Sequence, residues 1–396
     1  MRIKLQALYT SEGYRVESMN TDGALAQVNV VWDERCRPRC RDCGQAMRIN
    51  RKTAQAAMDL PLACASVVVV IYEAVQGFCA RCSHYQTVRP LDIVEQHRAT
   101  RRLMRHVSLL CRWLPTIRVC EVLPVPPATA WRYDRFILQT ELPFPNLDGL
   151  EAILIDEKHL GKSGFITLVL NARSGELLYL AEGRGKEALD GFFSRLSPEQ
   201  KASIAAVGMD RSGAYKSAVE EHLPQADIVF DKFHLISNYN EVIDKVRRRS
   251  YQEASLGERS FIKGQRYNLF RNPENLTDSG RKELNVLLEA NQDLSLVYLL
   301  KDYLKQVWTY TYRKCAEKTL LGWIGIAADS GIRELNRFAK GLEEAKDQIL
   351  SFCKHRITSA KIEAFNNIVS RVIHKACGVS NLDYLFLKLR QESLQR

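Results

Sequence analysis

The pattern of hydrophobic and polar positions changes twice along the chain. Near the N-terminus, a valine-rich apolar stretch over residues 63–74 is typical of a β-strand. Between residues 97 and 140 the apolar positions recur at helical spacing and are interrupted by prolines. This spacing predicts three helices, over Arg101–Trp113, 117–123 and 129–140. A proline-containing linker over residues 141–149 then leads into a third pattern.

From residue 151 onwards, short apolar runs alternate with helical spacing. Strands are predicted over 151–156, 165–171 and 177–181, followed by a helix, a strand over 203–209, a helix, a strand over 227–230 and a long helix. This order is that of the ribonuclease H-like fold, a mixed sheet with helices on its faces. Residues 235–357 indicate an all-helical insertion, and a last helix is predicted over 358–374.

Two of the predicted strands lead directly into an aspartate. The first strand ends in Asp156, and the fourth strand precedes Asp210. If these strands are neighbours, the two carboxylates lie side by side and repel each other unless cations lie between them. Carboxylate oxygens suit Mg²⁺ or Mn²⁺, and a two-metal site can activate a water or a 3′-hydroxyl and stabilise the leaving oxygen. Either aspartate alone is more simply a turn residue, but the pair in this order favours a metal site.

A third carboxylate is needed to complete such a site. Glu363 stands beside the apolar stripe of the last predicted helix and is our candidate. A glutamate in that position is commonly only solvated. Glu157, next to Asp156, is the local alternative.

Six of the eleven cysteines lie in the first 82 residues, and four of these form two Cys-x-x-Cys pairs. Two intervening residues allow a tight turn to direct both thiolates at one metal, so the four sulfurs predict a tetrahedral zinc site. The alternative is a redox pair. We interpret residues 1–95 as a zinc ribbon-like module stabilised by one structural Zn²⁺. The predicted ligands are Cys40, Cys43, Cys79 and Cys82, with Cys36 and His84 as further candidates.

The other cysteines do not suggest a disulfide framework. The cysteine total is odd, and the N-terminal sequence is mixed and polar, unlike a secretory signal. Cys64 lies in the apolar run and is expected in the core. No run of eighteen apolar residues occurs, so no membrane association is expected. We therefore expect a cytoplasmic protein.

The positive net charge indicates a polyanionic partner, and nucleic acid is the first candidate. The chain has 57 Lys and Arg residues against 46 Asp and Glu, a net charge of +11, and 46% hydrophobic residues exclude wholesale disorder. Residues 1–150 hold 20 of the basic residues against 14 acids, and 18 of those 20 are arginine. The guanidinium fork suits phosphates and guanine edges. The candidate DNA contacts are Arg37, Arg39, Arg41, Thr129, Trp131, Arg132 and Arg135.

The last four of these candidates lie on the third predicted helix. A short helix, a tight turn and a second helix match a helix-turn-helix, whose second helix enters the DNA major groove. Any small helical bundle has a similar pattern. The expected domains are therefore a zinc module (1–95), a helix-turn-helix (96–145), a ribonuclease H-like core in two parts (150–240 and 357–396) and a helical insertion (241–356).

Together these segments resemble bacterial insertion-sequence transposases of the ISL-three group over nearly the whole chain. The N-terminal resemblance lies in Cys40-Arg-Asp-Cys43-Gly44 and Phe78-Cys79-Ala-Arg-Cys82. The catalytic resemblance lies in four short motifs. These are Ile155-Asp156-Glu157, Val207-Gly-Met-Asp210, Asp231-Lys-Phe-His234 and Lys361-Ile-Glu363-Ala-Phe-Asn-Asn367.

The resemblance implies a DNA transposase that binds the terminal inverted repeats of its element. It would cut the DNA by metal-dependent hydrolysis and transfer the strand to target DNA. The implied metal-binding triad is Asp156, Asp210 and Glu363, with two Mg²⁺ (or Mn²⁺) ions and with Asp231 and His234 in support. Because two ends must be held together, a homodimer or higher homo-oligomer on double-stranded DNA is expected.

One departure from the group lies after the glutamate. The group usually has glycine there, followed by a basic stretch, whereas Ala364 follows Glu363 and residues 370–375 are less basic. Contacts to the DNA backbone in this stretch are therefore expected to be weaker or differently arranged. Two other functions stay open on the sequence: a catalytically silent DNA-binding regulator derived from a transposase, and a ribonuclease H-type structure-selective nuclease.

Overall fold

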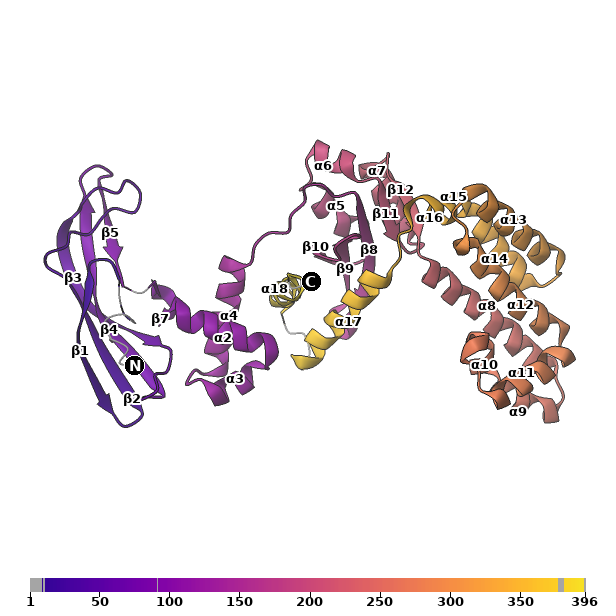
Figure 1. Ribbon diagram of the computed structural model, residues 1–396, viewed down its shortest axis with the longest axis horizontal. Coiled ribbons are helices and arrows are strands. Elements are labelled where there is room, and N and C mark those ends of the chain that lie inside the picture. Colours follow the sequence, from indigo (N-terminus) through magenta and orange to yellow (C-terminus); the bar gives the residue numbers. More distant parts are fainter. Residues whose placement is uncertain (1–8, 10, 91, 377–380, 395–396) are drawn as a thin grey trace. The chain divides into compact units, whose positions relative to one another are not determined.

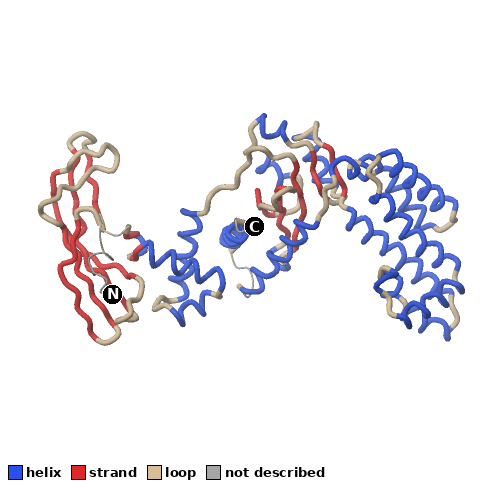
Figure 2. The backbone as a smooth tube through the Cα atoms, viewed as in Figure 1, coloured by secondary structure: helices blue, strands red, loops and turns tan. Residues whose placement is uncertain are grey.

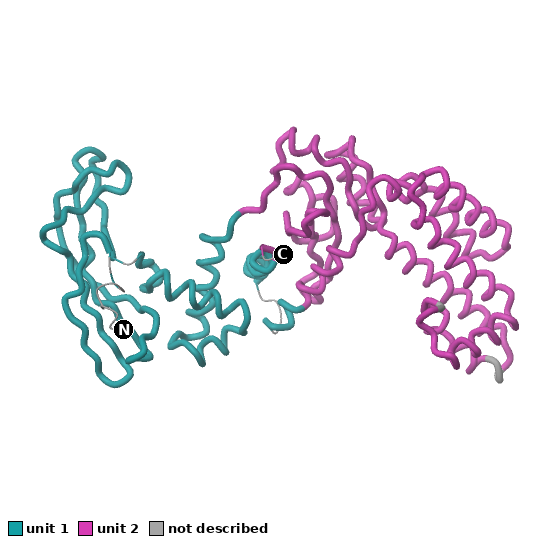
Figure 3. Tube along the Cα trace, viewed as in Figure 1, with its two compact units in different colours: residues 1–143, 371–392 teal, residues 144–370, 393–396 magenta. Residues whose placement is uncertain are grey.

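The computed structural model describes residues 9, 11–90, 92–376 and 381–394, and it divides into two compact units. Unit 1 comprises residues 1–143 and 371–392, and unit 2 comprises residues 144–370 and 393–396 (Figure 3). The last predicted segment, residues 357–396, therefore contributes to both units. Among the helices of the described residues, none has the length and apolar character needed to cross a bilayer.

Unit 1 begins with a seven-stranded sheet (Figure 1). Its strands are β1 (Tyr14–Asp22), β2 (Leu25–Trp32), β3 (Arg48–Asp59), β4 (Val67–Cys79), β5 (His84–Val88), β6 (Ile93–Val94) and β7 (Ala99–Thr100). The spatial order is β1-β2-β4-β3-β7-β6, and β5 pairs with β4. Buried and partly exposed residues alternate along β2 and most of β4, because successive side chains of a strand face opposite sides. The inward-facing valines and Tyr72 form the core of this sheet.

The valine-rich stretch is a strand, but it lies later than expected. β4 starts at Val67, and it is held on both sides by a parallel pairing with β2 and an antiparallel pairing with β3. Before it, Leu62 and Ala65 pair across a tight turn, and Cys64 is exposed there. The expectation that Cys64 lies in the core is therefore wrong, because this turn precedes the strand whose residues alternate into the core.

Three helices follow where the helical spacing predicts them: α2 (Arg101–Trp113), α3 (Thr116–Val122) and α4 (Pro127–Glu141). Thr100 caps α2, and its side chain accepts from the backbone N–H of Leu103 over 3.3 Å. Helix α18 (Leu382–Ser393) packs against the same group. The buried carboxylate of Asp134 on α4 accepts hydrogen bonds from Ser108 of α2 over 2.6 Å and from Lys388 of α18 over 3.0 Å.

The sheet of unit 2 has five strands in the order β10-β9-β8-β11-β12. They are β8 (Ala152–His159), β9 (Phe165–Asn171), β10 (Leu177–Glu182), β11 (Ala206–Met209) and β12 (Asp227–Phe230). β8, β9 and β10 form an antiparallel meander, and β11 runs parallel to both β8 and β12. The intervening helices are α5 (Glu187–Phe193), α6 (Pro198–Ser203) and α7 (Gly213–His222). The predicted order of strands and helices is therefore present, with α6 in addition.

Strand β8 continues beyond Asp156 to His159. Asp156, Glu157 and Lys158 all keep a partner on the antiparallel strand β9. The prediction that Asp156 ends its strand is therefore wrong, because the neighbouring strand extends the ladder past the apolar run. β11 does stop at Met209, so Asp210 follows its strand as predicted.

Residues 232–355, all of them described, are helical and contain no strand, as predicted (Figure 2). Trp323 lies in the core of this region, where its ring is 5.5 Å from that of Tyr239 and its Nε1–H donates to the carbonyl of Leu300 over 2.8 Å. Residues 333–355 form three helices that are separated by single residues. The helices are α8 (Lys232–Glu253), α9 (Leu256–Gly264), α10 (Arg266–Phe270), α11 (Asp278–Ala290), α12 (Gln292–Gln306), α13 (Arg313–Asp329), α14 (Arg333–Glu344), α15 (Lys346–Leu350) and α16 (Phe352–His355), followed by α17 (Ala360–Lys375).

Candidate functional site

Three neighbouring strands of unit 2 bring three aspartates side by side, because Asp156 lies within β8 and Asp210 and Asp231 directly follow β11 and β12. β11 lies between β8 and β12 and is parallel to both, so its register sets Asp210 next to Asp156 on one side and Asp231 on the other. The backbone N–H of Asp231 donates to the carbonyl of Met209 over 2.9 Å, which extends the ladder to the aspartates. The predicted neighbourhood of the first and fourth strands is thus confirmed. Ligands of α/β sheets bind at the carboxyl ends of parallel strands.

The three aspartates line one small pocket of about 10 Å³. His234 and Ser359 complete its polar lining, and Ile362 of α17 lies on its apolar side. A space of this size holds about one water molecule or one ion. The pocket therefore joins the sheet edge to the beginning of α17, which lies far along the chain.

Asp156 is the most constrained acid of the pocket. It is 9% exposed, its Oδ1 accepts from the backbone N–H of Glu157 over 2.8 Å, and its Oδ2 accepts from Nδ2 of Asn366 over 2.7 Å. Burial raises its pKa above the usual range, and the charge of Asp210 raises it further, against the two hydrogen bonds. Glu157 is half-buried, and burial followed by the charges of Asp210 and Asp156 raises its pKa. The negative charge of the pocket is therefore only partly balanced by the hydrogen bonds that its carboxylates accept.

Asp231 and His234 form a local unit at the start of α8. Asp231 is the N-cap of that helix, and its Oδ2 accepts from the backbone N–H of His234 over 2.9 Å. The same oxygen lies 3.2 Å from Nδ1 of the His234 ring. The other carboxylate oxygen, Oδ1, is buried and has no hydrogen-bond partner. A buried carboxylate oxygen without a donor is costly unless a cation or a water satisfies it.

Glu363 does not line the pocket, although its helix does. Its carboxylate is exposed and accepts a hydrogen bond from Oγ of Ser359 over 2.7 Å. One turn later on α17, Asn366 donates to Asp156. Glu363 therefore lies between two residues that touch the pocket or its aspartate. In the described residues, however, the groups of three ligand atoms within 4.8 Å of one another all include cysteines, so the acids are held apart.

The residues present fit divalent cations in type. The donors are carboxylate oxygens, which Mg²⁺ and Mn²⁺ prefer. Oδ1 of Asp231 has no hydrogen-bond donor, and burial together with the neighbouring carboxylates raises the pKa values of Asp156 and Glu157, so a cation would be favourable here. Carboxylates that repel one another are also kept apart until a cation neutralises them. Asp156, Asp210 and Asp231 can therefore hold a cation, whereas Glu363 lies outside the pocket on α17.

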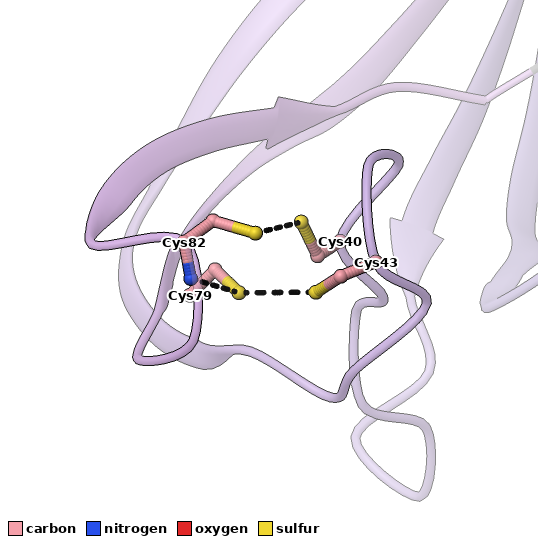
Figure 4. A group of neighbouring side chains, drawn as sticks. All are labelled: Cys40, Cys43, Cys79 and Cys82. Carbon is pink, nitrogen blue, oxygen red and sulfur yellow. Dashed lines mark hydrogen bonds between the residues drawn. The ribbon is translucent and has the colours of Figure 1, made fainter.

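The four predicted cysteines form a second, separate cluster in unit 1. Their sulfurs all lie within 4.8 Å of one another, and Figure 4 shows them facing each other from two loops. Sγ of Cys40 is 4.0 Å from that of Cys82, and Sγ of Cys43 is 3.6 Å from that of Cys79. A tetrahedron with Zn–S bonds of about 2.3 Å has edges of about 3.8 Å. The sulfurs are thus arranged as a structural zinc site requires.

Local backbone geometry prepares these sulfurs. The N–H of Cys82 donates to Sγ of Cys79 over 3.5 Å and is the main reason why the pKa of Cys79 falls, whereas the neighbouring thiol of Cys43 raises the pKa of Cys82. Gly44 closes the other loop with a φ of +71°, a backbone conformation that glycine adopts readily. A thiolate is the form that binds zinc. Both Cys-x-x-Cys turns therefore serve the same centre.

The two spare ligand candidates occupy different places. His84 lies next to the cluster, where Nε2 is 3.0 Å from Asp42 and Nδ1 is 3.0 Å from the carbonyl of Cys82. Its ring can support the Cys82 loop without replacing a sulfur. Cys36 packs partly buried against the core of the sheet, and its carbonyl accepts from Nε1 of Trp32 over 3.1 Å.

The arginines predicted to contact DNA in the zinc module are all exposed. Arg37 and Arg39 precede the first cysteine pair and Arg41 lies within it, and Arg39 donates to the carbonyl of Gly44 over 3.1 Å. Their guanidinium groups are therefore presented from a loop that the cysteines hold in place.

The candidates on α4 divide into two sets. Arg132 is exposed and donates to Oγ1 of the half-buried Thr129 over 3.1 Å. Trp131 is half-buried and its ring lies 5.7 Å from that of Tyr384 on α18, while the guanidinium of Arg135 lies 5.4 Å over the Trp131 ring. Trp131 thus contributes to the packing of α18, a role that the helical spacing alone did not indicate.

Sequence reasoning missed the roles of two polar residues at the pocket. Asn366 binds Asp156, and Ser359 binds Glu363. Ser359 directly precedes α17 and lies four residues before Glu363, and Asn366 lies three residues after it, so all three are on the same side of the chain there. This spacing was the sequence feature that could have indicated their roles.

Known proteins similar to this chain share its catalytic region. The profile of the ISL3 group of DDE transposases, described as "Transposase", matches residues 153–389. The transposase for insertion sequence element IS1001 of Bordetella parapertussis is 31% identical over 356 residues, which cover 89% of this chain and 87% of that protein. The transposase for insertion sequence element IS1557 of Mycobacterium tuberculosis is 26% identical over 289 residues, 66% of this chain and 64% of that protein. The matched profile includes every acid of the pocket and Glu363, and it implies a divalent-metal centre in a ribonuclease H-like core. The chain therefore belongs to the ISL3 family of DDE transposases.

Proposed function

We propose that this transposase cuts and joins DNA with Asp156, Asp210 and Glu363 as its catalytic acids, which hold two Mg²⁺ (or Mn²⁺) ions. The observation that carries the proposal is the convergence of parallel-strand aspartates on one pocket, with the helix of Glu363 hydrogen-bonded to Asp156. Asp231 and His234 support the site: Asp231 offers its orphaned oxygen, and His234 lies beside it. Glu157 is the alternative third ligand.

Each residue has a separate task in this mechanism. Asp156 and Asp210 would hold the cations, and Glu363 would complete the ligand set from α17. The ions, when bound, supply Lewis acidity that activates a water or a 3′-hydroxyl and stabilises the leaving oxygen. Hydrolysis frees a 3′-hydroxyl at the element end, and this hydroxyl then attacks a phosphodiester of target DNA. Both steps are in-line displacements at phosphorus without a covalent enzyme intermediate.

Unit 1 would hold the DNA ends. We infer that the cysteine cluster binds one structural Zn²⁺ in a zinc ribbon-like module, and that α3 and α4 act as a helix-turn-helix on the terminal inverted repeats. The exposed arginines around Cys40, together with Thr129 and Arg132, are the expected contacts. Two ends have to be paired, so the active form is a homodimer or a larger homo-oligomer on double-stranded DNA, acting on the bacterial nucleoid in the cytoplasm.

The test separates DNA binding from cleavage. Asp156→Ala should leave binding of the element ends unchanged and reduce Mg²⁺-dependent cleavage by about three orders of magnitude or more, because the acid touches the reacting centre. Glu182→Ala is the control, since Glu182 is an exposed acid on β10 of the same sheet. Excision from a donor plasmid carrying the element ends provides the second readout. Cleavage retained by Asp156→Ala in Mg²⁺ would contradict the triad.

A further inference from the structure

A groove with a basic lining runs between α8 and α14 in unit 2. It has a volume of about 550 Å³ and is lined by residues of both helices and by Arg211. Its cations are Arg211, Lys245, Arg333 and Arg337, and its carboxylates are Glu241 and Glu334. All four cations are exposed. The groove is therefore open to a ligand from solvent.

The cations of the groove are not compensated by the protein. In the described part of the chain, none of the four has a carboxylate within 4.0 Å, whereas Arg247, Arg248 and Arg249 on the same helix α8 all form ion pairs. Glu334 is itself paired with Arg249 over 2.8 Å. Glu241 remains as the only lining acid among the described residues that has no such pair. Exposed lysines and arginines are common, but four uncompensated ones in one groove create a local positive field.

The cations are also arranged along the groove. Arg333 and Arg337 are four residues apart on α14, and Gly341 continues the same face one turn later. Lys245 faces the groove from α8. Two helices thus present positive charge to the same groove. This arrangement suits an extended polyanion more than a single small anion.

Arg211 connects the groove to the catalytic pocket. It directly follows Asp210, and its guanidinium lies over α14 at Gly341. A Cβ at Gly341 would be 3.2 Å from Nη1 of Arg211, so the glycine allows the arginine to approach the helix this closely. The groove therefore begins one residue from a proposed metal ligand within the same unit.

We propose that this groove binds the phosphate backbone of the duplex that continues from the cut site, and that it thereby holds the scissile phosphodiester against the aspartates. The proposal rests on the proposed catalytic function of Asp156 and Asp210 and adds a DNA path to it. Arginine and lysine that neutralise phosphates release condensed counterions, so the groove should contribute to the salt dependence of DNA binding. The helical insertion would then be a DNA-binding element next to the active site.

The variant Arg333→Ala/Arg337→Ala tests the groove in the full chain. The control is Lys314→Ala/Lys318→Ala, which removes two exposed cations at the same spacing from α13, outside the groove. The probe is a fluorescein-labelled 40-base-pair duplex of arbitrary sequence, titrated at several salt concentrations. Each phosphate contact contributes about 0.9 to the slope of log K against log salt. We expect the groove variant to lower this slope by about 1 to 2, and the control to leave it unchanged.

A second measurement uses the wild-type protein and so does not depend on how the variants fold. Acetylation of lysines with an N-hydroxysuccinimide ester should slow several-fold at Lys245 when the 40-base-pair duplex is added, and should not slow at Lys314. The proposal would be overturned if the groove variant and the control had equal slopes of log K against log salt. It would also be overturned if the duplex left the acetylation of Lys245 unchanged. The groove would then suit an acidic protein segment better. A wild-type protein that cleaves DNA in Mg²⁺ while the groove measurements are negative disproves only the groove. Groove measurements that agree with the proposal, together with cleavage retained by Asp156→Ala, would disprove the triad and leave DNA binding by the groove intact.

Discussion

Asn366 donates a hydrogen bond from Nδ2 to Oδ2 of Asp156 over 2.7 Å, although 210 residues separate the two. The bond ties α17, which carries Glu363, to the strand that carries the first aspartate. The other amide atom of Asn366, Oδ1, is buried without a partner. Asn366 is thus placed to fix the orientation of the Asp156 carboxylate without touching the reacting atoms.

Replacing Asn366 should therefore weaken metal binding and cleavage together. Asn366→Ala removes the donor, and we expect a loss of about 10- to 100-fold in cleavage rate with a higher Mg²⁺ midpoint, as for other groups that orient metal ligands. Asn366→Asp should lose more, because it adds a negative charge next to Asp156. Asn367→Ala is the matched control, since Asn367 is exposed on the same helix. DNA binding should not change in any of them. An unchanged Mg²⁺ midpoint in Asn366→Ala would exclude a positioning role.

Zinc content tests the cysteine cluster. About one Zn per chain is expected by elemental analysis of the purified protein, because the four sulfurs make one tetrahedral site. Cys40→Ser/Cys43→Ser should lose it and should unfold at a lower temperature, since the small core around Cys40, Met47 and Cys79 is insufficient by itself. Cys64→Ser, at an exposed cysteine outside the cluster, should keep the full zinc content. Zinc retained by the double variant would contradict the assignment.

The buried carboxylate of Asp134 tests how the chain end is attached to unit 1. Asp134 is 0% exposed and Lys388 is 5% exposed, so Asp134→Ala leaves a buried ammonium group without its partner. We expect the free energy of unfolding to fall by about 3–5 kcal/mol, measured by denaturant titration. Ser108→Ala removes one hydrogen bond but leaves the ion pair, so it should lower the free energy of unfolding by only about 1 kcal/mol. The double variant Asp134→Leu/Lys388→Met should recover part of the loss. Equal effects of Asp134→Ala and Ser108→Ala would show that the ion pair contributes little.

Asp59 makes the stability of unit 1 depend on pH in the acid range. Burial by itself raises the pKa of this carboxyl, but hydrogen bonds from Arg102 and Thr100 and the charge of Arg102 outweigh burial and hold the pKa below its usual range. A folded-state pKa below the unfolded value means that the stabilisation is present above about pH 4 and is lost as the pH falls further. We expect the difference in melting temperature between wild type and Asp59→Asn to be largest near pH 6 and to shrink towards pH 3. Asp22→Asn, at an exposed acid at the end of β1, should show no such convergence.

The local pattern of the sequence was sufficient to predict most of the secondary structure. Proline positions and helical spacing predicted α2 exactly and α3 and α4 within two residues, because local sequence controls where such helices start and stop. The Cys-x-x-Cys spacing predicted the four-sulfur cluster for the same reason: each turn is closed by two intervening residues. The strand end at Asp156 was predicted wrongly, because it depends on β9, which lies across the sheet.

The sequence by itself therefore determined the chemistry available to this protein: the acids that follow apolar runs, the paired cysteines and the arginine excess. Only the tertiary structure decided which of these groups meet. The parallel register of β11 sets Asp210 between Asp156 and Asp231, and the helical insertion folds so that α14 presents its arginines beside Arg211. Such neighbours are fixed by sheet pairing and core packing between segments far apart in the chain, and no local spacing records them.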